Sequence, residues 1–249
     1  MFGDYSALKD VSLDINPCEI VSLLGVNGAG KTTLSSIVAS LHPPTSGDVL
    51  FDDVSIYNDI IAYRRNLGFC AQSQNLALHM TVREHLVFAG RYFSMKPHAI
   101  EHRVQELIEL FDLHKYIDAS PAILSGGYKQ RLLIARSIVH KPKLVILDEP
   151  TVALDPHIRR QLWDIIKGLK AQGVSVLLTT HYLDEAEILS DRICLLHAGR
   201  VQLIDTPQAL MSSYNKGRLE DVFIQLINEQ TPESSADAQA MARQGRDYL

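Results

Sequence analysis

The feature that most restricts the fold of this chain is a glycine-rich loop, GVNGAGKTT, at residues 25–33. It matches the pattern G-x-x-x-x-G-K-[ST], whose glycines let backbone amides surround a chain of phosphates. The apolar run EIVSLLG before it predicts a buried strand, and TTLSSIVASL after it predicts a helix with one apolar face. A strand, a loop and a helix in this order predict an α/β domain that binds a nucleotide.

Two side chains of this loop are expected to act directly on the nucleotide. Lys31 occupies the position that reaches the β- and γ-phosphates, and the Thr32 hydroxyl occupies the position that ligates Mg²⁺. The residues expected to bind the nucleotide here are Gly25, Asn27, Gly28, Ala29, Gly30, Lys31, Thr32 and Thr33.

Two later apolar runs extend the α/β pattern. LVILDEP (144–150) and VSVLLTT (174–180) predict two more buried strands. A helix is expected between them, with Asp155 as its N-cap, Pro156 as its first residue and Gly173 as its stop. The apolar face of that helix consists of Ile158, Leu162, Ile165, Ile166 and Leu169. Strands joined through a helix at this spacing indicate a mainly parallel sheet.

The rest of the chain divides around this core. Residues 80–140 read as a helical insertion, in which Ile100, Val104, Leu107, Ile108 and Phe111 share one face. ALKDVSLDI (7–15) and GDVLFDDVSIY (47–57) predict short strands of an antiparallel sheet near the N-terminus. We therefore expect an α/β core at about 1–79 and 141–210, a C-terminal helix at about 217–229, and a disordered tail at 231–249.

Composition excludes several classes of protein. The net charge of −5 and the pI near 6.0 give no electrostatic reason to expect a nucleic-acid partner. The three cysteines include no CxxC pair, which argues against a disulfide framework and a zinc site. No run approaches the roughly 18–20 apolar residues that span a bilayer, so any membrane role must come through a partner.

Polar residues follow several of the apolar runs. Asp148 and Glu149 end LVILDEP, His181 follows VSVLLTT, and Gln72 follows the run LGFCA. Asp148 suits the coordination of Mg²⁺, and Glu149 suits the polarisation of an attacking water. His181 can hydrogen-bond a γ-phosphate at the same edge of the sheet. Taken singly, each also has an ordinary interpretation: an acidic strand end, a structural histidine and a surface glutamine.

A second candidate phosphate-binding segment, LSGGYKQRL, lies at residues 124–132. Ser125, Gly126 and Gly127 supply a hydroxyl and bare backbone amides at the start of a predicted helix, where the helix dipole favours an anion. One chain with one complete phosphate loop has no evident need for a second.

Together these motifs resemble the nucleotide-binding subunit of an ABC transporter. In family terms, residues 25–33 match the Walker A loop, Gln72 the Q-loop and residues 124–128 the signature. Residues 144–149 match Walker B, ALDP (153–156) the D-loop and His181 the switch histidine. The fold that this resemblance implies is a P-loop NTPase core with a mainly parallel sheet, an N-terminal antiparallel β subdomain and an inserted α-helical subdomain.

The resemblance also implies an ATP hydrolase that works as a dimer. Its cofactors would be ATP and Mg²⁺, its catalytic residues Lys31, Gln72, Glu149 and His181, and its metal ligands Thr32, Gln72 and Asp148. Two such subunits pack head to tail, so that Ser125, Gly126 and Gly127 would bind the partner's γ-phosphate, with Asp155 at the dimer interface. This assigns the second phosphate site to the neighbouring subunit.

Several positions depart from the family pattern. Tyr128 stands where the signature most often has Gln, Val26 replaces the usual Pro of the loop, and Cys18 replaces a common Gly. The adenine-stacking aromatic of the family falls at Phe2, close to the start of the chain and without the strand that usually precedes it. Tyr5 is the alternative ring.

The implied partners are integral membrane transporter subunits and a second ATPase subunit, either identical or related. The chain would then lie on the cytoplasmic face of the cell membrane, peripheral and not inserted. The segments 179–200 and LEDVFIQL (219–226) resemble subunits of ABC-2 type exporters, which favours export. The alternatives are a soluble ABC-type ATPase acting in a process other than transport, and a degenerate binding module. Against the first, Leu124 follows Lys31 by only 93 positions, and the stretch between them contains no sustained heptads. Against the second, every candidate catalytic residue is present.

Overall fold

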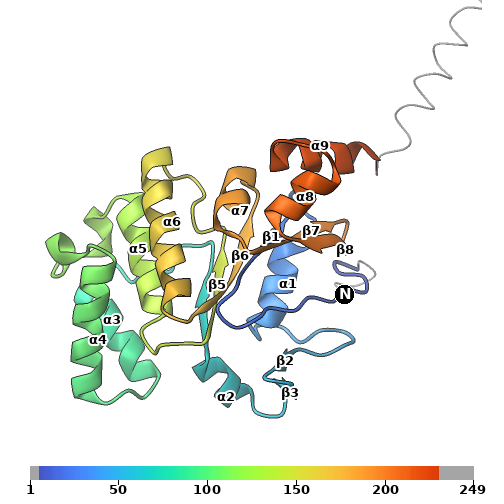
Figure 1. Cartoon of the computed structure of the whole chain (residues 1–249). Coiled ribbons are helices and arrows are strands. Elements are labelled where there is room, and N and C mark those ends of the chain that lie inside the picture. The colour runs from blue at the N-terminus through green and yellow to red at the C-terminus, as the bar shows by residue number, and fades with distance from the viewer. Residues whose placement is uncertain (1–5, 230–249) are drawn as a thin grey trace, which may run out of the picture.

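The computed structural model describes residues 6–229, and the side chains of residues 6–226. Its centre is a six-stranded sheet in the order β4-β5-β6-β1-β7-β8 (Figure 1). The strands are β1 (Ile20–Leu24), β4 (Leu67–Cys70), β5 (Leu144–Asp148), β6 (Ser175–Thr180), β7 (Arg192–His197) and β8 (Arg200–Asp205). All neighbours pair in parallel except β7 and β8, so the expected mainly parallel α/β sheet is confirmed.

Helices cover both faces of this sheet. They are α1 (Lys31–Val38), α2 (Ile60–Arg65), α3 (Val82–Tyr92), α4 (Pro97–Leu110), α5 (Gly126–Ser137), α6 (Pro156–Ala171), α7 (Leu183–Leu189), α8 (Pro207–Ser213) and α9 (Leu219–Glu229). Two short 3₁₀ helices, His114–Tyr116 and Pro121–Ile123, lie between α4 and α5. A separate antiparallel pair consists of β2 (Leu50–Phe51) and β3 (Val54–Ser55).

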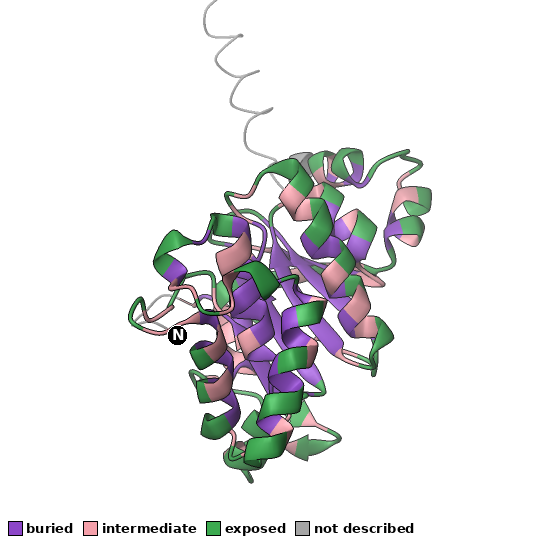
Figure 2. Ribbon diagram, turned by 90° about the vertical axis from the view of Figure 1, so that its left-hand side faces the viewer, coloured by how far each residue is buried: buried purple, intermediate pink, exposed green. Residues whose placement is uncertain are grey.

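Alternate residues of the central strands face two different hydrophobic clusters, because successive side chains of a strand point to opposite faces. Val145, Leu147, Val176 and Leu178 pack with residues of α3 to α6 in one cluster. The intervening residues, among them Ile146 and Leu177, pack with Leu34 of α1 in the other. Figure 2 shows the strands buried almost throughout, while the helices turn exposed faces outward. The continuous apolar runs of the sequence reflect this two-sided burial.

The described residues between β4 and β5 form helices and turns and contain no strand. Thr81 and Glu84 make a capping box that begins α3. The expected apolar face of residues 100–111 is confirmed, since Ile100, Val104, Leu107, Ile108 and Phe111 are all buried. Asp155, Pro156 and Gly173 also delimit α6 as expected, and Gly173 adopts a left-handed φ of 87°.

The strand expected at residues 7–15 is wrong. Val11, Leu13 and Ile15 alternate with exposed polar residues and pack against the α1-side cluster, yet this segment forms no ladder. Lys9 N donates one hydrogen bond, of 2.7 Å, to Gly199 O. Alternating hydrophobicity reports one-sided burial, and here that burial is reached by an extended segment without a pairing partner. The antiparallel pairing of this region is confined to β2 and β3. The tail 231–249 lies outside the described residues.

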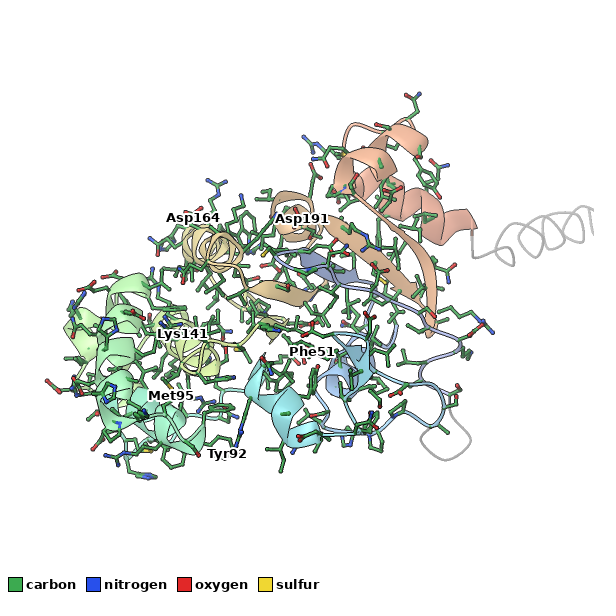
Figure 3. The ribbon with its side chains drawn as sticks, turned by 60° about the horizontal axis from the view of Figure 1, so that its bottom comes forward. Phe51, Tyr92, Met95, Lys141, Asp164 and Asp191 are labelled. Carbon is green, nitrogen blue, oxygen red and sulfur yellow. The ribbon has the colours of Figure 1, made fainter. Side chains whose placement is uncertain are left out.

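His140 joins the helical region to the edge strand β4. Its ring stacks on Phe93 at 3.5 Å between centroids, and Nε2 lies 3.0 Å from Leu67 O. Since a carbonyl only accepts, Nε2 must carry the proton, which leaves Nδ1 as a buried acceptor with no partner in the described structure. Burial lowers the pKa of His140 to about 4. Tyr92, Met95 and Lys141, labelled in Figure 3, flank this contact in sequence.

We predict that His140 makes the protein acid-sensitive. Its imidazole is neutral in the fold but takes a proton in the unfolded chain below its ordinary pKa of 6.5. The stability that depends on this neutral form is therefore complete above 6.5 and is lost as the pH falls toward 4. His140→Gln keeps a donor for Leu67 O. Between pH 7 and 4.5 its unfolding temperature should therefore fall less than that of the wild type. The control His98→Gln, at an exposed site on α4, should follow the wild type. Equal loss in all three proteins would contradict this role of His140.

Candidate functional site

The glycine-rich loop connects β1 to α1, and its glycines leave parts of its backbone uncovered by side chains. Gly28 and Gly30 have left-handed φ values of 82° and 107°, which residues with a Cβ rarely adopt. A Cβ at Gly30 would also lie 2.9 Å from Ala7 O. Gly30 is the N-cap of α1 and no side chain caps this end, so the helix presents backbone amides to the loop.

Lys31 is buried inside this loop, with only 5% of its surface exposed. Its Nζ donates hydrogen bonds to Gly25 O at 2.7 Å and to Val26 O at 3.2 Å. Burial lowers the pKa of Lys31, and the charges of Glu149 and Asp148 oppose that effect. A buried ammonium beside unpaired amides is arranged to receive an anion.

The first acidic residue, Asp148, ends β5 and is 4% exposed. The Thr179 hydroxyl donates to its Oδ1, and Thr179 Oγ1 accepts from the amide of Glu149 at 2.9 Å. Burial raises the pKa of Asp148, with Glu149 acting in the same direction and Thr179 and Lys31 opposing. Thr179 was not among the expected site residues, although its place at the polar end of a buried strand was a usable signal.

These residues fit a Mg²⁺ ion bound together with phosphates. No group of three His, Cys, Asp or Glu residues suited to a metal occurs within residues 6–229. Mg²⁺ usually keeps several waters and binds through one or two carboxylates plus substrate phosphates. A single buried carboxylate, Asp148, with the exposed hydroxyl of Thr32 at the start of α1, is a donor set of that kind.

Two residues that are distant from Glu149 in the sequence contact its side chain. Gln72 Nε2 donates to Glu149 Oε2 at 2.9 Å, and His181 Nδ1 lies 3.4 Å from Glu149 Oε1. Glu149 itself has a left-handed φ of 48°, uncommon for a residue with a side chain. The structure thus brings Gln72, Glu149 and His181, which the sequence motifs had singled out separately, into one cluster.

The segment after Gln72 is attached to the helical region. Arg136 of α5 donates to Asn75 O at 3.0 Å and also to the Asn75 side chain. His85 of α3 lies 3.1 Å from Ala77 O. The position of Gln72 therefore depends on the helices that follow it.

The second glycine segment forms the start of α5. Ser125 is exposed as the N-cap, and its hydroxyl accepts a long hydrogen bond of 3.5 Å from Tyr128 N. A Cβ at Gly127 would lie 2.5 Å from Ile158 Cγ2, so close packing against α6 requires glycine there. Figure 1 shows α5 and α1 well separated, with β5 between them. The helix that this segment begins is therefore separate from α1 and its phosphate loop.

The remaining expected residues are also located. Asn27, Gly28 and Asp155 are exposed, whereas Ala29 is buried and Thr33 is half-buried. Asp155 is the N-cap of α6 but its side chain makes no capping hydrogen bond. Phe2 and the alternative Tyr5 lie outside the described residues.

The sheet order, the loop and the acidic strand end define a phosphate-loop protein that binds nucleoside triphosphates. The sequence profile of the ABC transporter family matches residues 8–152. The chain belongs to the ABC transporter family and carries its ATP-binding ATPase domain. No helix among the described residues is long and apolar enough to cross a bilayer.

Relatives within this family include exporter subunits. Nod factor export ATP-binding protein I of Bradyrhizobium diazoefficiens is 38% identical over 213 residues, which cover 86% of this chain and 70% of that protein. The protein of the same name from Rhizobium meliloti strain 1021 is 40% identical over 198 residues, 80% of this chain and 59% of that protein. Part of each relative therefore lies outside the match.

Solved structures agree with the fold. An ATP-binding subunit of an ABC transporter superposes with a TM-score of 0.82 at 29% identity, covering 91% of this chain and 95% of that one. A dimeric post-hydrolysis state of an ATP-binding cassette, bound to ADP and Pi, superposes with a TM-score of 0.72 at 30% identity. It covers 80% of this chain and 90% of its own.

We predict that Thr179→Val weakens nucleotide binding mainly when Mg²⁺ is present. The change keeps the side-chain shape but removes the hydroxyl that orients Asp148, and unpaired buried groups cost about 1–3 kcal/mol. Nucleotide dissociation constants measured with Mg²⁺ and with EDTA should show a larger loss in Mg²⁺. The control Thr206→Val removes an exposed acceptor for Ala209 N at the start of α8 and should leave this Mg²⁺ dependence unchanged. An equal loss under both conditions would contradict the role of Thr179.

Proposed function

We propose that this chain hydrolyses Mg²⁺-bound ATP in a head-to-tail dimer and thereby drives export through separate membrane subunits. The observation that carries the catalytic part is the contact of Glu149 with both Gln72 and His181 beside the phosphate loop. A carboxylate held from two sides at that place is suited to orienting an attacking water.

In this mechanism different residues around the loop bind the phosphates, hold Mg²⁺ and orient the water. The amides at the start of α1 and the Lys31 ammonium bind the β- and γ-phosphates. Thr32, Asp148 and the amide oxygen of Gln72 would hold Mg²⁺, which supplies charge neutralisation when bound. Glu149 orients the water and accepts its proton.

His181 is proposed to complete this arrangement. Its Nδ1 contacts Glu149, so an imidazolium ring here, which donates from both nitrogens, could hold the carboxylate with Nδ1 and the γ-phosphate with Nε2. Groups held in this way by contacts within the protein limit the reorganisation that the reaction requires.

The signature segment is proposed to act on the partner's ATP. Ser125 is exposed at the start of α5, a helix separate from α1, and Gly126 and Gly127 follow it. A second copy, or a related ATPase subunit, packed head to tail would place this helix N-terminus against its γ-phosphate. Asp155, exposed beside the same surface, would lie at the dimer interface.

Mixing two inactive variants tests hydrolysis and the dimer together. Lys31→Ala loses a working phosphate loop and Ser125→Arg loses a working signature, so each homodimer should be nearly inactive. In a mixed head-to-tail dimer one composite site contains both intact halves. Random pairing should then restore up to about a quarter of the wild-type ATPase activity. Proven mixed dimers that bind ATP without recovering activity would contradict a signature acting in trans.

The membrane partner is proposed to dock on the helical insertion at about residues 80–140. Phe88 and Tyr92 of α3 are 60% and 75% exposed and, four residues apart, share one face of the helix. Exposed aromatic side chains of this kind favour a protein contact. The likeness to Nod factor export ATP-binding proteins supports export, and the chain would then be peripheral on the cytoplasmic face of the membrane.

Purification from gently solubilised membranes tests this partner. The tagged chain should recover an integral membrane subunit, identified by mass spectrometry. Phe88→Glu combined with Tyr92→Glu should reduce the recovery at least about fivefold, because charge at the centre of an interface is strongly disfavoured. The control Ile224→Glu changes an exposed apolar residue on α9 and should not reduce it. Recovery of only non-membrane partners would favour the ABC-type ATPases that act outside transport.

A further inference from the structure

A fully buried carboxylate lies behind the proposed catalytic cluster. Glu185 of α7 is 0% exposed, and its Oε1 accepts two hydrogen bonds. One comes from Thr151 Oγ1 at 2.8 Å and the other from Trp163 Nε1 at 2.9 Å. Burial raises the pKa of Glu185, although hydrogen bonds with the side chains of Thr180, Thr151 and Trp163 oppose that effect. Burying a carboxylate is costly, and no residue of the mechanism described above uses this one.

The first of these bonds reaches the turn that carries Glu149. Thr151 follows Glu149 by two residues and is 1% exposed. The turn contains a second left-handed residue, Ala153, at a φ of 58°. Its internal backbone bonds, Val152 N to Glu149 O and Leu154 N to Thr151 O, are both long at 3.3 Å. The short Thr151–Glu185 bond therefore attaches this turn to α7, while the bond from Glu149 N to Thr179 Oγ1 attaches its first residue to β6.

The helix that carries Glu185 also connects it to His181. Glu185 lies on the first turn of α7, four residues after His181, and α7 packs beside α6. Arg159 of α6 stacks over the Tyr182 ring at 4.1 Å and contacts Asp184 at 3.5 Å. Asp164 on α6 and Asp191 just after α7, both labelled in Figure 3, mark these two neighbouring helices. The helix that follows His181 is thus fixed against α6.

We propose that Glu185 is a positioning residue that holds Glu149 and His181 at a fixed relative placement, through Thr151 on one side and its own helix on the other. This inference rests on the proposed ATP hydrolysis. Glu185, Thr151 and Trp163 form what we call the Glu185 cluster. Only the Thr151 bond reaches the turn of Glu149, whereas the Trp163 bond joins α6 to α7.

The two donors allow a matched test of this proposal. Thr151→Val and Trp163→Phe each remove one hydrogen bond from the same oxygen, so both should lower the unfolding temperature. Thr151→Val should lower kcat between about 10- and 100-fold, because misplacing a reacting group is costly, with KM for ATP nearly unchanged. Trp163→Phe should keep kcat within about twofold of the wild type. Loss of kcat in proportion to lost stability in both variants would show a merely structural role and overturn the proposal.

Two variants of Glu185 provide the rescue. Glu185→Gln keeps an oxygen acceptor and should retain most of kcat, whereas Glu185→Ala should lose as much as Thr151→Val. Trp163 is the only tryptophan of the chain, so a shift of its emission in Glu185→Ala shows independently that the Glu185 cluster is broken. A broken cluster with wild-type kcat overturns the proposal and leaves the proposed function intact. A wild-type protein that binds ATP without hydrolysing it would overturn both.

Discussion

The burial of one lysine and one carboxylate beside the same loop is the constraint on which the rest of the site depends. Lys31 and Asp148 are each about 5% exposed or less, and burial lowers the pKa of the first and raises that of the second. Both charged forms are therefore disfavoured until counter-charges arrive. In the proposed function, phosphates and a divalent cation would supply those counter-charges together. The free energy that it costs to bury Lys31 and Asp148 would then favour the binding of a metal–nucleotide pair.

The order of strands explains why the site residues meet. β4, β5, β6 and β1 are consecutive neighbours, and all run in parallel. Their carboxyl ends lead in turn to Gln72, to Asp148 and Glu149, to His181 and to the phosphate loop. Parallel strands end at one edge of a sheet, so four separate motifs become one site. Thr179 then fixes the acidic pair, and the proposed Glu185 cluster fixes the two loops from behind.

The second candidate phosphate-binding segment, at residues 124–132, is not part of the site formed by these four strands. Ser125 is the N-cap of α5, a helix that Figure 1 shows apart from α1, and close packing of Ile158 leaves no room for a Cβ at Gly127. In the proposed head-to-tail dimer, each chain carries half of each of two sites. Its own Gln72 loop is tied to α5 through Arg136 and Asn75. The two halves carried by one chain are therefore mechanically connected, which gives each nucleotide a physical route to the other.

The sequence by itself determined the features that depend on local sterics and burial. It predicted the phosphate loop, the limits of α6 from Asp155 to Gly173, and the buried face of α4, because these are encoded in neighbouring residues. It wrongly predicted a strand at residues 7–15, because alternation reports burial and not pairing. Only the tertiary structure decided that Gln72 and His181 both contact Glu149, and that Glu185 is buried with Thr151 and Trp163. Such contacts join residues far apart in the chain, and the desolvation of a polar group depends on everything packed around it.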